Sequence, residues 1–303
     1  MNINEGVAIS GFVLARKWRP KNFISVVGQE ITVKAIHHAL KNDSFHHAYL
    51  FTGNRGVGKT TMARLVSKAV NCNFKKSLEP CTTCSICLEI DAGKFPDVIE
   101  IDAASNRGVE EIQQILEQTH FFPTIGKKRI IVIDEVHMLS NHAFNAMLKI
   151  LEEPPDHIIF ILATTDPQKI PSTVVSRCLQ FVLKNIPVEL MTSFIYKVLD
   201  SEEIYYEKSA IIRLAQAAGG SMRDALSLVD QAIACGEGKI QTDNVNQMLG
   251  LVQNEAINSL VKEIANKDIK KSLTLGSEIL ASGVSAESVL KELAKIFHKC
   301  LVQ

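Results

Sequence analysis

Residues 53–60, GNRGVGKT, combine glycines, a lysine and a threonine in the pattern G-x-x-x-x-G-K-[ST]. The backbone N–H groups of such a loop cradle phosphate at a helix N-terminus, where aligned peptide dipoles favour negative charge. Lys59 would reach the β- and γ-phosphates, and the Thr60 hydroxyl would bind Mg²⁺. A glycine-rich loop without a nucleotide role is the alternative, but a strand-like run before it and a helical pattern after it favour ATP. The predicted nucleotide-binding residues are Gly53, Asn54, Arg55, Gly56, Val57, Gly58, Lys59, Thr60 and Thr61.

A pair of acidic residues supplies the second half of a hydrolytic site. The run RIIVIDEVHML (129–139) carries adjacent carboxylates at Asp134 and Glu135, at the end of an apolar stretch. Ligands of open α/β sheets bind at the carboxyl ends of strands. Asp134 is placed to hold Mg²⁺ through its water shell, and Glu135 to orient and polarise the attacking water. Alternatively the two acids only cap the following helix. Together with the phosphate loop, the pair predicts an active ATPase.

Four of the seven cysteines lie close together in the sequence, in the pattern C-x₈-C-x₂-C-x₂-C. Four thiolates suit tetrahedral Zn²⁺, and a closed four-ligand site is structural rather than catalytic. An iron–sulfur cluster and buried free thiols are the alternatives; the missing Cys-Pro and the upstream fourth cysteine favour zinc. We expect the remaining Cys178, Cys235 and Cys300 to be small buried apolar residues. The predicted zinc ligands are Cys72, Cys81, Cys84 and Cys87.

The elements that must position these residues alternate between two patterns. Amphipathic helical patterns such as 109–120 and 141–153 separate short apolar runs, and this order predicts a parallel sheet with helices on both faces. After Pro187 only helical periodicity is found, which predicts a small helical domain and a further helical region beyond it. The apolar runs are 47–53, 97–104, 129–136, 157–165 and 178–183.

Composition limits the class of protein. The chain has 303 residues, 46% of them hydrophobic and 22% charged, as in ordinary globular domains. No apolar run reaches the length of a membrane span, and residues 1–12 look like a tail without a secretory signal. The net charge is zero, so any contact with DNA must be local or shared with partners.

Besides GNRGVGKT and IDEVHMLS, the chain carries the stretches VVGQE, LEEPP, ATTDPQKIP, SRC and RDALSL. Together these stretches closely resemble the gamma/tau subunits of bacterial DNA polymerase III, clamp-loader ATPases of the AAA+ class. The resemblance implies an AAA+ core with a five-stranded parallel sheet at 13–187, a helical lid at 188–242 and a helical collar, apparently incomplete, at 243–303. It also implies a zinc-binding insertion at 72–87. The matching stretches are VLARKWRP, VVGQE, HHAYLF, GNRGVGKT, EIDAAS, IDEVHMLS, LEEPP, ATTDPQKIP, SRC and RDALSL.

The same resemblance assigns further roles. Thr165 would sense the γ-phosphate. For Arg177 the alternative to a functional role is a surface salt bridge, and for Arg223 it is a charge on a solvated helix face. Arg177 would be an arginine finger for a neighbour's ATP, and Arg223 a second sensor for the chain's own nucleotide. Near the start of the chain, the basic residues around Trp18 suggest either a nucleic-acid patch or a collar around adenine. We expect the collar, formed by Arg19, Pro20 and Val27.

As a whole, the resemblance implies an ATP-hydrolysing motor subunit within the DNA-directed DNA polymerase III holoenzyme, which loads the sliding clamp onto primed DNA. The implied partners are delta, delta-prime and further gamma/tau copies, in the bacterial cytoplasm and at the nucleoid during replication. Because the collar looks incomplete, we expect weak self-association and weak basal ATPase. A branch-migration helicase, a non-hydrolysing scaffold and a zinc-based DNA reader are the alternatives. Residues 121–124, FFPT, would be either an apolar docking site or a local core contact.

Overall fold

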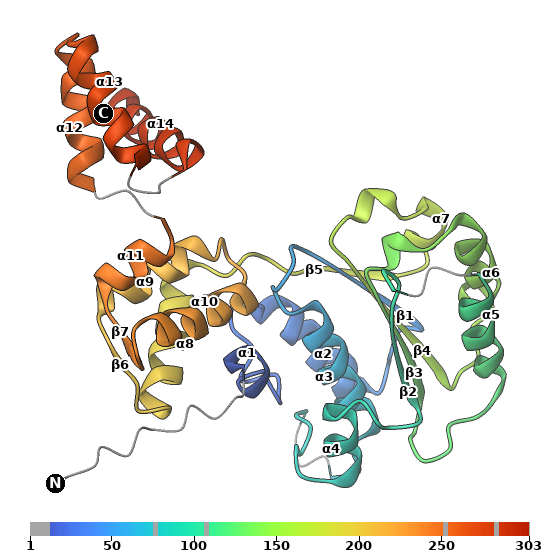
Figure 1. The fold of residues 1–303 in the computed structure, drawn as a ribbon. Helices are drawn as coiled ribbons and strands as arrows, with labels where there is room; N and C mark the ends of the chain where they lie inside the picture. Colours follow the sequence, from blue (N-terminus) through green and yellow to red (C-terminus); the bar gives the residue numbers. More distant parts are fainter. Residues whose placement is uncertain (1–12, 75–77, 106–108, 251–253, 282–284, 303) are drawn as a thin grey trace, which may run out of the picture. The chain divides into compact units, whose positions relative to one another are not determined.

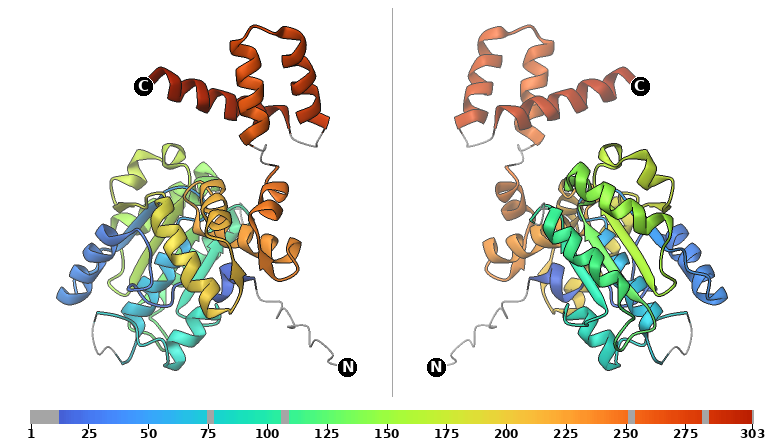
Figure 2. Two further views of the ribbon diagram at one scale, coloured as in Figure 1. Left: turned by 90° about the vertical axis from the view of Figure 1, so that its left-hand side faces the viewer. Right: turned by 90° about the vertical axis from the view of Figure 1, so that its right-hand side faces the viewer.

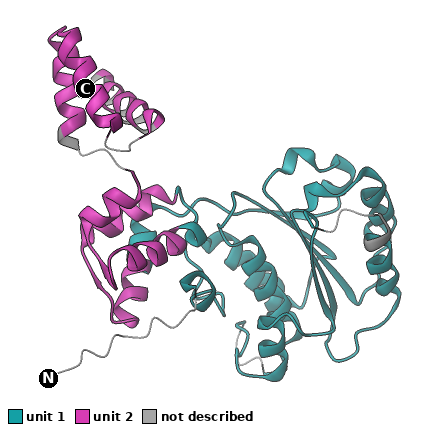
Figure 3. Ribbon diagram, in the orientation of Figure 1, with its two compact units in different colours: residues 1–194, 219–224 teal, residues 195–218, 225–303 magenta. Residues whose placement is uncertain are grey.

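A computed structural model describes residues 13–74, 78–105, 109–250, 254–281 and 285–302. The predicted tail at 1–12 lies outside these ranges. The chain divides into two compact units, residues 1–194 with 219–224 and residues 195–218 with 225–303 (Figure 3). Within the described residues, no helix has both the length and the apolar character needed to cross a membrane.

The first unit contains a five-stranded sheet in the order β2-β3-β4-β1-β5, with neighbouring strands parallel (Figure 1). The predicted α/β fold with a five-stranded parallel sheet is therefore confirmed. All five predicted apolar runs form strands, but only the three inner ones are buried along nearly their whole length; β2 and β5 are edge strands, and β5 is largely exposed. The strands are β1 (Ala48–Thr52), β2 (Val98–Asp102), β3 (Arg129–Asp134), β4 (Ile158–Thr164) and β5 (Leu179–Val182).

Helices cover both faces of this sheet because successive strand residues point to opposite sides. Leu50 and Ile131 belong to the core beneath α5, α6 and α7, whereas Tyr49 and Ile130 belong to the core beneath α2 and α3. The right-hand view of Figure 2 shows α5 and α6, in green, in front of the strands. The helices are α1 (Leu14–Lys17), α2 (Glu30–Asn42), α3 (Lys59–Asn71), α4 (Ser85–Asp91), α5 (Val109–Glu117), α6 (Asn141–Glu152) and α7 (Ser172–Val175), with 3₁₀ turns η1 (Gln118–His120), η2 (Val136–Met138) and η3 (Pro167–Lys169).

The chain after Pro187 is helical as predicted, with one exception. Two short parallel strands, β6 and β7, pair Tyr205 with Lys239 and Tyr206 with Ile240; two-residue strands are too short to produce a period-two pattern. Farther along, α12, α13 and α14 share a small apolar core that includes Ile257 and Ile279. The elements are α8 (Val188–Ser201), β6 (Tyr205–Tyr206), α9 (Lys208–Ala217), α10 (Met222–Cys235), β7 (Lys239–Ile240), α11 (Thr242–Met248), α12 (Asn254–Ala265), α13 (Ile269–Ala281) and α14 (Ala286–Val302).

Candidate functional site

The glycine-rich loop connects β1 to α3, as the motif predicts. Lys59 is the first residue of α3 and is only 5% exposed. Its Nζ donates hydrogen bonds to the carbonyl oxygens of Gly53 at 2.9 Å and Asn54 at 3.0 Å. Burial lowers the pKa of Lys59, while the carboxylates of Glu135 and Asp134 oppose that shift. The ammonium group is therefore folded across its own loop, close to both predicted catalytic acids.

Thr60 and Asp134 meet although 74 residues separate them. The Thr60 hydroxyl donates to Asp134 Oδ2 at 2.5 Å, and Asp134 Oδ1 accepts the backbone N–H of Glu135 at 2.9 Å. This contact follows from the topology, because β1 and β3 lie on either side of β4 and end at the same edge of the sheet. A hydroxyl and a carboxylate at this spacing are ligands that Mg²⁺ accepts.

The Glu135 carboxylate lies beside the carboxyl end of β4. Its Oε2 accepts the backbone N–H of Thr165 at 3.1 Å and the Thr165 hydroxyl at 2.8 Å. His137 Nδ1 lies 3.4 Å from the same oxygen and 2.9 Å from Thr164 Oγ1. Thr165, the predicted sensor, is thus hydrogen-bonded to Glu135, the residue predicted to polarise the attacking water. His137 was missed by the sequence analysis, since no spacing rule marks the second residue after an Asp-Glu pair.

The start of α10 packs against the phosphate loop within the first unit. The Arg223 backbone N–H lies 3.5 Å from the Gly56 carbonyl oxygen. Gly56 has φ +76°, and a Cβ added there would lie 1.9 Å from Ser221 Oγ. A side chain at this position is thus disfavoured both by the left-handed backbone and by the close approach of Ser221. The structure therefore brings Arg223, the predicted second sensor, to the glycine-rich loop of its own chain.

Arg19 lies in a group of arginines. Burial lowers the pKa of Arg19, and the charges of Arg64 and Arg223 lower it further, while Glu100 opposes them. Arg64 is held by Glu100 through two hydrogen bonds of 2.7 and 2.9 Å. Arg19 of the predicted adenine collar thus lies near the charges of Arg64 on α3 and of Arg223 at the start of α10. Pro20 and Val27 are both half-buried.

Arg177 does not contact the phosphate loop of its own chain through any hydrogen bond within the described residues. Its guanidinium donates to the Thr173 carbonyl oxygen and to Glu152 Oε1, each at 2.7 Å. The two side chains of this ion pair are 34% and 52% exposed, so the pair lies at the surface, where such contacts stabilise by about 0–1 kcal/mol. An arginine that is weakly held at the surface remains accessible to another molecule.

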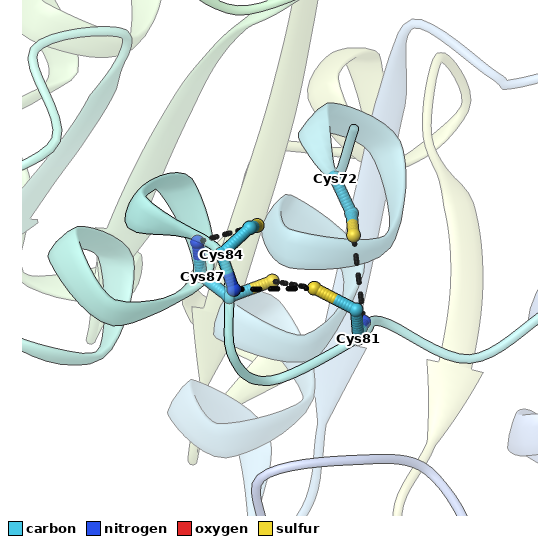
Figure 4. Close-up of side chains that lie close together, drawn as sticks. All are labelled: Cys72, Cys81, Cys84 and Cys87. Atoms are coloured by element: carbon cyan, nitrogen blue, oxygen red, sulfur yellow. Dashed lines mark hydrogen bonds between the residues drawn. The ribbon is translucent and has the colours of Figure 1, made fainter. Parts of the chain in front are cut away.

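The four clustered cysteines converge between α3 and α4 (Figure 4). Their Sγ atoms all lie within 4.8 Å of one another, and Cys81 and Cys87 Sγ are 3.9 Å apart. Backbone N–H groups point at the sulfurs: Cys72 Sγ accepts from Cys81, Cys81 Sγ from Cys84, and Cys84 Sγ from Cys87, at 3.3–3.4 Å. Sulfurs at Zn–S distances of about 2.3 Å in a tetrahedron would be about 3.8 Å apart. The donor set therefore fits a single metal ion.

The cysteines differ in acidity. Burial raises the pKa of Cys72 and of Cys87. Burial would also raise the pKa of Cys81, but hydrogen bonds from the backbone N–H groups of Thr83 and Cys84 outweigh burial and lower this pKa to about 6. Cys81 is thus the most acidic of the thiols with a shifted pKa, and a bound cation would favour deprotonation of all four sulfurs.

Part-buried contacts of Lys68 and Glu79 attach this cysteine module to the rest of the first unit. Lys68, on the phosphate-loop helix α3, is fully buried and pairs with Asp91 of α4 at 2.8 Å. The same ammonium group donates to the Lys21 carbonyl oxygen, and Glu79 Oε2 accepts the Phe23 backbone N–H at 2.7 Å. The module is therefore connected both to the helix that begins at Lys59 and to the segment that contains Arg19.

Outside the module, one cysteine prediction is wrong and one is only partly met. Cys235, the last residue of α10, is exposed. Cys178 is half-buried, and burial raises its pKa to about 11. The side chain of Cys300 lies outside the described part of the structure.

Comparison with known proteins places the chain in a family. Residues 28–187 match the family model "DNA polymerase III, delta subunit", residues 192–238 match "DNA polymerase III clamp loader subunit, ATPase lid domain", and residues 240–303 match "DNA polymerase III subunits gamma and tau domain III". The chain is 48% identical to DNA polymerase III subunit tau of Escherichia coli over 287 residues, 95% of this chain and 45% of that protein. It is 44% identical to DNA polymerase III subunit gamma of Buchnera aphidicola subsp. Acyrthosiphon pisum over 286 residues, 94% of this chain and 79% of that protein.

The chain belongs to the gamma/tau family of DNA polymerase III subunits. It spans less than half the length of the tau subunits of Salmonella typhimurium and Escherichia coli that it matches. Among solved structures, a branch-migration motor, RuvB of Thermotoga maritima, matches with a TM-score of 0.55 and 19% identity over 91% of each chain. At that identity the match shows a shared fold alone. The resemblance to gamma/tau subunits that the sequence motifs suggested is confirmed.

Proposed function

We propose that this gamma/tau family chain is an ATP-hydrolysing motor subunit of the bacterial DNA polymerase III clamp loader, which loads the sliding clamp onto primed DNA. The contact between Thr60 and Asp134 at 2.5 Å carries the proposal, because it joins the two halves of a hydrolytic site next to Glu135. Membership of the gamma/tau family supports the clamp-loading role. Delta, delta-prime and further gamma/tau copies are the proposed partners, in the cytoplasm and at the nucleoid during replication.

In this mechanism the chain positions ATP and stabilises the charge that develops on the transferred phosphoryl group. Lys59 would leave the loop carbonyls for the β- and γ-phosphates, while Thr60 and Asp134 would hold Mg²⁺, which neutralises phosphate charge when bound. Glu135 would orient the attacking water and accept its proton. The hydroxyl of Thr165 would report the γ-phosphate to Glu135 through their hydrogen bond.

The proposed roles of the arginines differ. Arg223, next to Gly56, would act on the nucleotide of its own chain. Arg177 would leave Glu152 and reach ATP held by a neighbouring subunit, where an arginine finger can accelerate hydrolysis by about 10³–10⁵. Arg19, Pro20 and Val27 would surround the adenine.

For the cysteine module we propose Zn²⁺ held by Cys72, Cys81, Cys84 and Cys87. Sulfur atoms within 4.8 Å of one another suit one ion, whereas an iron–sulfur cluster would hold its cysteine sulfurs farther apart around several iron atoms. The metal would be structural, since all four positions are filled by protein ligands. Metal analysis of the purified chain by mass spectrometry tests this, and one zinc per chain is the expected result.

The test of the motor role is ATP turnover measured with delta, delta-prime, sliding clamp and primed DNA, each omitted in turn. We expect strong stimulation only when both clamp and primed DNA are present, and none with Lys59→Ala. Turnover driven by duplex DNA without a clamp would support a translocating helicase, and no turnover at all would support a non-hydrolysing scaffold. Arg177→Ala mixed with Lys59→Ala chains then tests whether the guanidinium acts on a neighbour's nucleotide.

A further inference from the structure

His137, which has no role in the mechanism so far, lies next to the Glu135 carboxylate. Three contacts, from the Thr165 N–H, the Thr165 hydroxyl and His137 Nδ1, converge on Oε2. The other oxygen, Oε1, has no hydrogen bond to any described residue of the chain. One oxygen is thus fixed while the other stays available to accept a proton from water. This division suits a residue that must orient a nucleophile.

The backbone brings His137 to this position. Glu135 adopts a left-handed conformation with φ +47° and ψ +44° and precedes the short 3₁₀ turn η2. The Met138 N–H then donates to the Glu135 carbonyl oxygen at 2.9 Å. This tight turn folds the chain back at the end of β3, so that His137 meets Thr164, the last residue of β4. Left-handed backbone is unfavourable for a glutamate, and such strain occurs preferentially at functional sites.

The neighbours of the imidazole determine which nitrogen carries hydrogen. Thr164 Oγ1 accepts the backbone N–H of Asp166 at 3.0 Å and lies 2.9 Å from His137 Nδ1. The Glu135 carboxylate offers lone pairs only, so its approach to Nδ1 is attractive when Nδ1 bears the proton. With the His137 side chain 10% exposed and Thr164 fully buried, water competes little for these groups. We assign the Nδ1–H tautomer, with its hydrogen shared between Thr164 and Glu135.

We propose that His137 is a positioning residue for ATP hydrolysis: through Nδ1–H it anchors Glu135 Oε2 and Thr164 Oγ1, so that Glu135 Oε1 faces the attacking water. The proposal rests on the ATPase function proposed above. It differs from a direct catalytic role because His137 touches neither the phosphate loop nor Asp134 through any hydrogen bond within the described residues. It predicts an effect on kcat through Glu135, with nucleotide affinity unchanged.

A matched pair of variants tests it. The amide nitrogen of asparagine can occupy the place of Nδ1, whereas the longer glutamine carries its amide to the place of Nε2. In the clamp-stimulated assay, we expect H137Q to lower kcat about tenfold, the upper range for one modest hydrogen bond. H137N should remain within about threefold of the wild-type kcat. For both variants KM and the Kd of a fluorescent ATP analogue should stay within about twofold of wild type. Thr164→Val, which removes the second partner of Nδ1, should lower kcat as H137Q does.

A double variant separates positioning from general damage. If His137 acts through Glu135, then adding H137Q to E135Q should change the residual single-turnover rate by less than about twofold. A tenfold further loss in that background, or equal kcat values for H137N and H137Q, would overturn the proposal. Melting temperatures of all variants identify any that are misfolded, in which case Thr164→Val decides. A wild-type chain without turnover would overturn the ATPase function as well, whereas active wild type with indistinguishable variants refutes this inference alone.

Discussion

The buried carboxylate of Asp97 organises the segment that leads into β3, and its replacement by asparagine gives a sharp test of the structure. Asp97 is 0% exposed. Its oxygens accept the N–H groups of Thr124 at 2.8 Å and of Ile125 and Gly126 at 2.7 Å each. The Arg129 guanidinium lies 3.4 Å from Oδ1. All the hydrogen-bond partners of this side chain among the described residues are donors.

Asparagine keeps the shape but replaces one acceptor oxygen with a donor NH₂ group. The less damaging orientation sacrifices the Thr124 hydrogen bond and the Arg129 contact, both of which involve Oδ1. Charge-assisted hydrogen bonds contribute about 1.5–3 kcal/mol each, so we expect Asp97→Asn to destabilise the first unit by about 3 kcal/mol. At about 2–4 °C per kcal/mol for a unit of this size, the melting temperature should fall by about 6–12 °C.

The assay is thermal unfolding of Asp97→Asn beside Asp156→Asn, which removes the same charge from an exposed position. The control should melt within about 1 °C of wild type, as most surface substitutions do. Equal melting temperatures for wild type and Asp97→Asn would refute the hydrogen-bond argument.

The pH dependence of the Asp97 contribution gives a second check. Burial would raise the pKa of Asp97, but the N–H groups of Gly126, Thr124 and Ile125 outweigh it, and the pKa lies below its ordinary value. Because the folded pKa is depressed, the stabilisation is complete above about pH 4 and is lost as the pH falls through the folded pKa. The difference between wild type and Asp97→Asn should therefore narrow below pH 4.

Three further outcomes are expected. Gly56→Ala should weaken binding of a fluorescent ATP analogue at least tenfold, because its Cβ would collide with Ser221 at 1.9 Å; Gly93→Ala, also at positive φ but with no atom within 4 Å of the added Cβ, should bind normally. Removing metal with a strong chelator should release one zinc per chain and lower the melting temperature, and Cys87→Ser should melt at the chelated value; unchanged melting would contradict a structural metal. Arg177→Ala should leave the nucleotide Kd within about twofold while clamp-stimulated turnover falls by about 10³; a large loss of affinity would place the guanidinium on its own chain's nucleotide.

Features formed by residues close together in the sequence, such as the phosphate loop and the cysteine cluster, could be predicted correctly. The phosphate loop follows β1 and begins α3 because the residues that form it are contiguous and their glycine spacing reflects backbone requirements. The apolar runs identify the five strands of the sheet, since burial demands apolar side chains. The tight cysteine spacing likewise anticipates a cluster, because two-residue gaps keep the sulfurs close. Strands β6 and β7 were not predicted, because a strand of two residues is too short to show an alternating pattern of apolar and polar residues.

Contacts between residues far apart in the sequence could not be predicted from the sequence alone. His137 and Thr164, Arg177 and Glu152, and Asp97 with the N–H groups after Pro123 are separated by 25 or more residues. The sequence by itself determined the chemistry available, namely a phosphate loop, an acidic pair and a set of thiols, because each is defined by neighbouring residue types. Only the tertiary structure decided that Glu135 is anchored by His137 and Thr165 and that Arg177 is held by Glu152. These pairings arise from the order and register of parallel strands, and no short-range pattern encodes that arrangement.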